Sequence, residues 1–63
     1  MQDQTTSDRL LRLRQVIELT GIGKTMIYRL MRDNQFPHQF KPGGYASRWS
    51  EREVLEWVSK TRS

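Results

Sequence analysis

Five side chains able to make polar or ionic contacts recur at a spacing that brings them to one side of a helix. They are Lys24, Thr25, Tyr28, Arg29 and Arg32. From Thr25 onward they follow the i, i+3, i+4, i+7 pattern, which places residues on a single helical face. Long cationic side chains on such a face suit a polyanion, because their donors can reach phosphates or base edges. A solvated helix face is the plainer interpretation of the same spacing.

A second group of polar side chains surrounds the paired glycines Gly43 and Gly44. The group consists of Lys41, Tyr45, Ser47 and Arg48. Glycine tolerates tight turns and lets a backbone approach another surface closely, so this segment is predicted to be a hairpin tip near a ligand. Arg48 precedes Trp49, an expected core residue, so alternation along a strand places the Arg48 side chain on the outer side. An ordinary charged hairpin tip would carry the same residues.

Enzymatic chemistry has little support in this chain. It contains a single histidine, His38, and no cysteine. No second metal ligand of a suitable type neighbours His38, and no nucleophile is paired with a base. No glycine-rich phosphate loop precedes a Lys-Ser or Lys-Thr pair. We therefore expect a protein that is not an enzyme and that uses no cofactor or metal ion.

Length and charge restrict the class of protein further. The 63 residues allow one small domain, and no apolar run approaches the roughly 18 residues that span a membrane. Residues 9–48 carry a net charge of +6, whereas residues 1–8 carry −2 and residues 51–63 are neutral. A basic block predicts a polyanion-facing surface, although a basic surface that only confers solubility fits the charge equally well. The lack of cysteine and of a signal-peptide pattern favours the cytoplasm.

Hydrophobic spacing predicts the elements that must position these side chains. Helices are predicted over 14–20, over 24–33 and from 51 onward, with a short strand over 9–13 before them. Gly21-Ile22-Gly23 forms the turn between the first two helices. Strands at 39–41 and 47–49 flank the glycine-rich tip. Ser50 and Glu53 match a capping box at the start of the third helix, which is expected to fray from Ser59.

The predicted core is built from apolar positions that share helix faces, together with aromatic side chains. It consists of Leu13, Val16, Ile17, Ile27, Leu30, Met31, Phe36, Phe40, Trp49, Val54, Trp57 and Val58. The predicted domain covers 9–60, between a disordered tail at 1–8 and a frayed end at 61–63. Its order is short strand, helix, turn, helix, two-stranded wing, helix. This order is mainly α with a small β-hairpin, the winged helix-turn-helix class.

Taken together, the motifs resemble those of one known family. The run LRLRQVIELTGIGKTMIYRLMRDNQFP (11–37), followed by GGYASRWSEREVLEWV (43–58), resembles the AlpA-like prophage regulators, which are phage excisionase-type winged-helix proteins. The resemblance implies binding of short duplex DNA sites in a prophage or mobile element, as a transcriptional regulator or an excisionase (a recombination directionality factor). Two positions depart from the pattern. Gly23 stands where a capping serine is usual, and Tyr45 stands where a basic residue is common.

These observations yield a hypothesis of sequence-specific DNA binding. The helix at 24–33 enters the major groove, where Arg29 reads a guanine while Lys24 and Arg32 contact phosphates. The expected partners are double-stranded DNA and an integrase or RNA polymerase, with no membrane. The free protein is expected to be a monomer and to bind DNA cooperatively, since it lacks an apolar heptad repeat.

The alternative is a small interaction module that modulates a regulator or an integrase without DNA. Its contacts would come from charged side chains of the third helix, namely Glu51, Glu53, Glu56 and Lys60.

Overall fold

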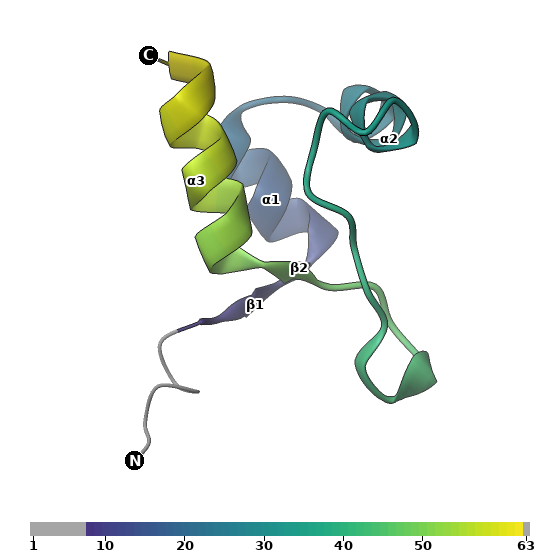
Figure 1. The fold of residues 1–63 in the computed structure, drawn as a ribbon. Helices are drawn as coiled ribbons and strands as arrows, with labels where there is room; N and C mark the ends of the chain where they lie inside the picture. Colours follow the sequence, from purple (N-terminus) through teal and green to yellow (C-terminus); the bar gives the residue numbers. More distant parts are fainter. Residues whose placement is uncertain (1–7, 63) are drawn as a thin grey trace.

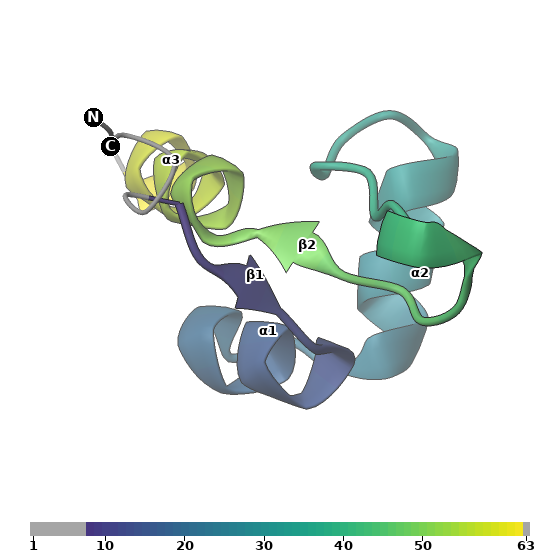
Figure 2. The same cartoon turned by 90° about the horizontal axis from the view of Figure 1, so that it is seen from below.

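The computed structural model describes residues 8–62, which form three helices joined by a short antiparallel pair of strands (Figure 1). The elements are β1 (Leu10–Leu11), α1 (Leu13–Thr20), α2 (Lys24–Arg32), β2 (Trp49–Ser50) and α3 (Glu51–Arg62), with a 3₁₀ turn at Pro42–Gly44. Figures 1 and 2 show α3 on one side of the strand pair, and α2 with the segment that follows it on the other. The predicted class, mainly α with a winged helix-turn-helix, is confirmed.

The turn between α1 and α2 depends on Gly21. This residue has a φ of +79°, and its N–H donates to the carbonyl oxygen of Ile17 at 2.8 Å. Glycine takes this left-handed conformation without the steric cost that a Cβ would impose. Gly23 then precedes α2 at the N-cap position and supplies no side-chain cap. Asn34, just beyond α2, has a left-handed φ of 58°.

The core joins every helix and both strands. Its buried apolar side chains among the described residues are Leu11, Val16, Ile27, Met31, Phe36, Trp49 and Val54. The other helical positions predicted for the core pack against it in half-buried positions; they are Leu13, Ile17, Leu30, Trp57 and Val58. The inward faces predicted for the three helices are therefore confirmed.

Phe40 is not a core residue, and its predicted burial is wrong. Its side chain is 44% exposed. Phe40 forms an antiparallel bridge with Arg48, in which each N–H donates to the other's carbonyl oxygen, at 2.9 and 2.8 Å. Opposed residues in such a bridge direct their side chains to the same face. Because Trp49 takes the inward face, its neighbour Arg48 and the opposed Phe40 point outward.

The hairpin over 39–49 is less regular than the predicted two-stranded wing. Within the described part of the chain, the Phe40–Arg48 bridge is the backbone pairing between its two arms. Pro42 has no N–H to donate, and Gly43 and Gly44 have φ values of +72° and +81°. These conformations suit a tight tip and do not extend a ladder. The wing is thus a turn closed by one bridge.

The strand pair links the two ends of the domain instead. Leu10 lies opposite Ser50, and Leu11 lies opposite Trp49. Leu11 and Trp49 are both fully buried, so the register directs these two opposed side chains into the core.

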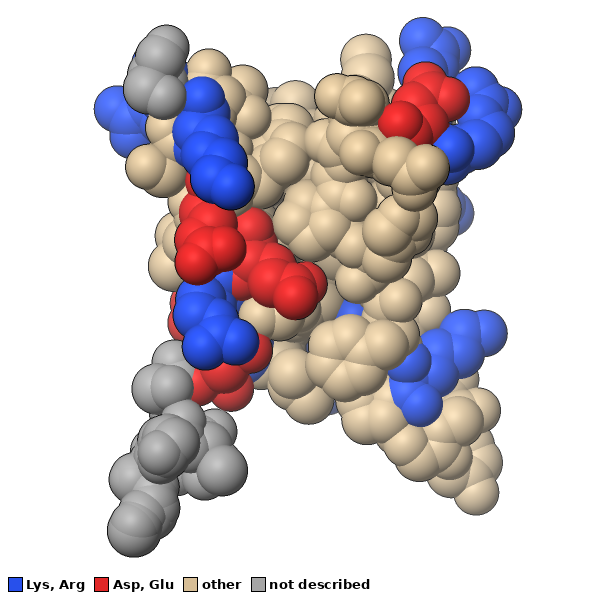
Figure 3. All heavy atoms as spheres, viewed as in Figure 1, with Lys and Arg blue, Asp and Glu red and all other residues tan. Residues whose placement is uncertain are grey.

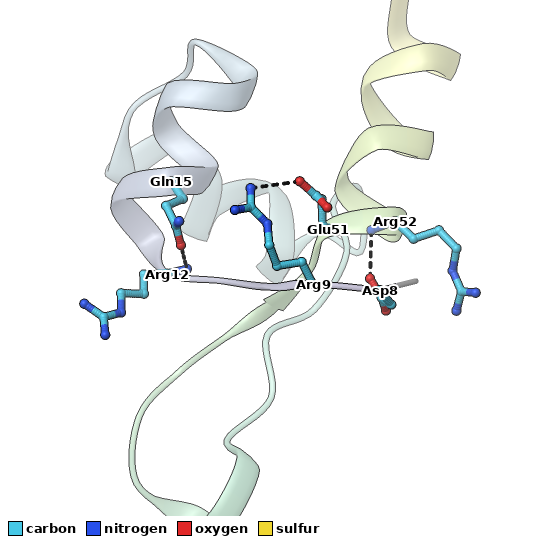
Figure 4. Close-up of polar contacts among 6 residues, drawn as sticks. All are labelled: Asp8, Arg9, Arg12, Gln15, Glu51 and Arg52. Carbon is cyan, nitrogen blue, oxygen red and sulfur yellow. Dashed lines mark hydrogen bonds and ion pairs between the residues drawn. The ribbon is translucent and has the colours of Figure 1, made fainter. Parts of the chain in front are cut away.

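The start of α3 is capped by two side chains. The hydroxyl oxygen of Ser50 accepts a hydrogen bond from the N–H of Glu53 at 3.3 Å, which confirms the Ser50 half of the predicted capping box. The same hydroxyl donates to the Asp8 carboxylate at 2.7 Å, and Asp8 accepts from the N–H of Arg52 at 3.1 Å (Figure 4). Free N–H groups of the first turn are thereby satisfied. The predicted disordered tail over 1–8 otherwise lies outside the described residues.

The end of α3 differs from the prediction, because the helix continues to Arg62 rather than fraying from Ser59. Trp57 packs edge-on against Phe36, with ring centroids 4.8 Å apart. Its indole N–H donates to the carbonyl oxygen of Gln35 at 2.7 Å. These contacts hold the second half of α3 on the chain that follows α2.

The cap at Asp8 makes stability depend on pH. The hydrogen bond from Ser50, and next the backbone N–H of Arg52, lower the pKa of Asp8, because both favour the ionised carboxylate. A lowered pKa means that this stabilisation is complete above the ordinary value of 3.8 and is lost as the pH falls below it. We expect Asp8→Ala to reduce the free energy of unfolding by about 1 kcal/mol near neutral pH. Urea denaturation should show that the difference in unfolding free energy between the native protein and Asp8→Ala becomes smaller in acid than near neutral pH. An equal difference in acid and near neutral pH would contradict a charge-dependent cap.

Candidate nucleic-acid interface

The outward face of α2 brings together the five side chains singled out from their spacing. Lys24, Thr25, Tyr28, Arg29 and Arg32 line one shallow cavity of about 510 Å³. All are exposed except Tyr28, which is half-buried. The opposite face of α2 is fixed in the core by its apolar residues. The helix is therefore held by one side and presents a cationic surface on the other.

Tyr28 has a positioning role that its spacing alone does not indicate. Its ring lies edge-on to the ring of Trp49, with centroids 6.4 Å apart. Its hydroxyl donates to the side-chain carbonyl oxygen of Gln39 at 3.5 Å. Tyr28 thus links α2 to the first arm of the hairpin through Gln39 and to β2 through Trp49.

The hairpin residues lie outside the α2 cavity. Lys41 and Tyr45 are exposed, and the Tyr45 side chain is 90% accessible at the tip. Ser47 and Arg48 are half-buried, and the Arg48 guanidinium donates to the carbonyl oxygen of Ser47 at 2.9 Å. The predicted site therefore consists of two separate patches, one on α2 and one on the hairpin.

Charge is unevenly spread over the molecule. The chain from 24 to 48 carries five basic residues and one acidic residue, Asp33, which lies 3.8 Å from Arg32 as an ion pair. In Figure 3, basic side chains lie over α2, with an acidic one among them, and a further basic group lies near the hairpin, separated from α2 by uncharged surface. Acidic side chains gather over α3, where basic ones lie among them. The two predicted patches are thus both basic, with uncharged surface between them.

Two residues of this region differ from what the residue types predict. Gln39 was not singled out, although it accepts the Tyr28 hydrogen bond, and Phe40 was assigned to the core. The exposure of Phe40 depends on its position opposite Arg48, and residue types alone carry no signal for that register. The Gln39 contact requires α2 and the hairpin to meet in the folded chain.

The described residues also bear on whether the chain holds a metal site or a membrane span. The Nε2 atom of His38 lies 3.0 Å from the side-chain oxygen of Asn34, and residues 8–62 contain no group of three or more His, Cys, Asp or Glu side chains arranged to hold a metal. Within the same range, every helix is too short or too polar to cross a bilayer.

Comparison with known proteins gives a family match over nearly the whole domain. The family described as Prophage CP4-57 regulatory protein (AlpA) matches residues 9–62. The chain is also 37% identical, over 54 residues, to "Uncharacterized protein ORF88" of Enterobacteria phage P4; the match covers 86% of this chain and 61% of that protein. No solved structure matches it. The family match covers the helix-turn-helix, the hairpin and α3, and the chain therefore belongs to the AlpA family of prophage regulatory proteins.

Proposed function

We propose that this chain is a sequence-specific DNA-binding regulator that inserts α2 into the major groove of duplex DNA. The main support is the set of cationic and polar side chains on the exposed face of α2, held outward by the buried apolar face of the same helix. The major groove admits a helix and presents a distinct pattern of donors and acceptors for each base pair. Membership of a prophage regulatory family supports the same function.

Each side chain of the interface has a proposed role. Arg29, in the middle of the face, makes a bidentate contact to guanine, and Thr25 contacts a thymine methyl group or a phosphate. Lys24 and Arg32 contact phosphates. The hairpin makes further contacts to the sugar-phosphate backbone of the DNA through Lys41, Tyr45, Ser47 and Arg48. Tyr28 holds the hairpin against α2.

The proposed output is regulation of transcription or of excision for a prophage or mobile element. The protein acts by binding, without catalysis or a cofactor, in the cytoplasm, where an integrase or RNA polymerase would be its protein partner. In the alternative function, it binds such a partner without DNA.

Salt dependence separates these two functions. Four phosphate contacts, from Lys24, Arg32, Lys41 and Arg48, should reduce affinity about 100-fold between roughly 50 and 200 mM salt. Gel-shift titrations on a duplex selected from a random-sequence pool would measure this slope. A protein that binds no duplex at any salt concentration is a partner-only module.

Arg48 provides a test of the hairpin patch. We expect Arg48→Ala to weaken DNA binding and to reduce the slope of log affinity against log salt by about one, because one phosphate contact is lost. The same titrations on Arg52→Ala, which removes an exposed arginine from α3, give the matched control. An unchanged slope in Arg48→Ala would remove this residue from the interface.

The mode of assembly gives a further prediction. One helix and one wing contact about 600–1,000 Å² of surface, so we expect the free protein to be a monomer that gains specificity by binding adjacent repeated sites. Neighbouring copies should bend the duplex, as assembly of an integrase complex requires. Sedimentation of the free protein and circularly permuted gel shifts test this. A stable free dimer on one palindrome of straight DNA would instead indicate a conventional repressor or activator.

A further inference from the structure

A groove of about 850 Å³ runs between α3 and the chain that follows α2. Residues 34–38 line one side of it, and the other side is formed by Glu53, Glu56, Trp57, Lys60 and Thr61 of α3. None of the side chains proposed to contact DNA lines this groove. It is therefore a second concave surface, separate from the face of α2.

The groove has an apolar base. Phe36 is buried there, and Pro37 and Trp57 are half-buried. The indole N–H of Trp57 already donates to Gln35, so its polar group is satisfied and the accessible remainder is aromatic ring. A tryptophan presented in this way is typical of the residues that dominate protein–protein binding energy.

Acidic side chains flank this base. Glu53 and Glu56 are exposed and lie three residues apart, on one side of α3. In the described part of the chain neither forms an ion pair, whereas Glu51 is 3.0 Å from Arg9. Lys60, four residues after Glu56, lines the same groove, so its lining carries two carboxylates and one ammonium group. A net negative lining is an exception in a chain whose overall net charge is +4. Adjacent like charges on a helix are mildly unfavourable, and a cation placed between them relieves the repulsion.

We propose that this groove binds a segment of a partner protein in which a lysine or arginine lies next to a large apolar side chain. The apolar side chain packs on Trp57 and Pro37, and the cation is held by Glu53 and Glu56. A cationic segment is repelled by the two basic patches of the domain, so charge directs it to this groove. Because α3 and α2 lie on opposite sides of the strand pair (Figures 1 and 2), the partner can bind while α2 contacts DNA.

The test uses the whole chain and synthetic peptides. The probe is the amidated peptide Arg-Leu-Arg-Phe, with Glu-Leu-Glu-Phe as its acidic counterpart, and the readout is the indole N–H resonance of Trp57 in an NMR titration. We expect the basic peptide alone to shift this resonance saturably. The double variant Glu53→Gln/Glu56→Gln should bind the basic peptide about threefold to tenfold more weakly, as expected for the loss of two exposed charge pairs.

Glu18 supplies a matched control, since it is an exposed glutamate on α1 outside the groove. Glu18→Gln should leave peptide affinity unchanged, and thermal melting should show all variants folded. Three outcomes would overturn the proposal: equal binding of the acidic peptide, an equal loss in Glu18→Gln, or a concentration-dependent shift of Trp57 without peptide, which would assign the groove to a second copy.

DNA binding is measured in parallel, because the two proposals can fail separately. Arg29→Ala should lose DNA affinity while it retains the peptide, and Glu53→Gln/Glu56→Gln should bind DNA as Glu18→Gln does. A protein that binds peptide but no duplex refutes only the DNA-binding function, and one that binds duplex but no peptide refutes only the groove.

Discussion

Trp49→Ala should remove most of the stability of the protein. Trp49 is completely buried at the meeting point of both strands, and its side chain also contacts Tyr28 of α2. Truncation of a core aromatic costs about 3–5 kcal/mol, whereas a domain of 63 residues has a total stability of only about 3–9 kcal/mol. Circular dichroism during thermal melting should show a cooperative transition lost or shifted to much lower temperature.

Phe40→Ala is the matched control for this experiment. Phe40 is also an aromatic residue of the hairpin region, but its side chain is 44% exposed. Its truncation should change the melting temperature little, because the ring already contacts solvent. Normal melting of Trp49→Ala, or equal destabilisation by the two substitutions, would contradict the inward and outward faces assigned to the hairpin.

Substitution of Arg29 should change which DNA sequences are bound, not only how tightly. A bidentate contact to guanine contributes about 1–3 kcal/mol of discrimination between base pairs. In Arg29→Ala, the ratio of the affinities for the matched and the single-mismatch duplex should therefore be about tenfold smaller than in the native protein. Lys24→Ala should weaken all duplexes about equally, because a phosphate contact carries no sequence information.

Binding curves on a selected site and its single-mismatch variants would separate the two effects. Arg52→Ala again controls for the loss of one exposed positive charge, this time from α3. If neither Arg29→Ala nor Lys24→Ala alters any affinity, α2 is not the recognition helix.

Local periodicity was sufficient to locate the helices. The i, i+3, i+4 spacing identifies the inward faces, because a helix repeats every 3.6 residues whatever surrounds it. In α1 these residues are Leu13, Val16 and Ile17, and in α2 they are Ile27, Leu30 and Met31. Gly21 marks the end of α1 for an equally local reason, its φ of +79°. The end of α3 could not be predicted in this way, because Trp57 contacts Phe36 and Gln35, which lie about 20 positions earlier in the chain.

The two candidate sites also differ in how far they depend on residues that are close together in the chain. The α2 face could be predicted because all five of its residues belong to one helix. The α3 groove could not, because half of its lining comes from residues 34–38 and its walls meet only in the folded chain. Spacing along one element says nothing about a surface formed between two.

The sequence by itself determined the helices, the helix-turn-helix and the basic face of α2, since these depend on neighbours within one or two turns. Only the tertiary structure decided the hairpin register, the exposure of Phe40, the pairing of Trp49 with Leu11 and the cap that Asp8 forms on α3. Each of these joins residues that are distant in the chain, or depends on which strand face the core occupies. A register shift of one residue exchanges the two faces of a strand, and packing around Trp49 selects between them.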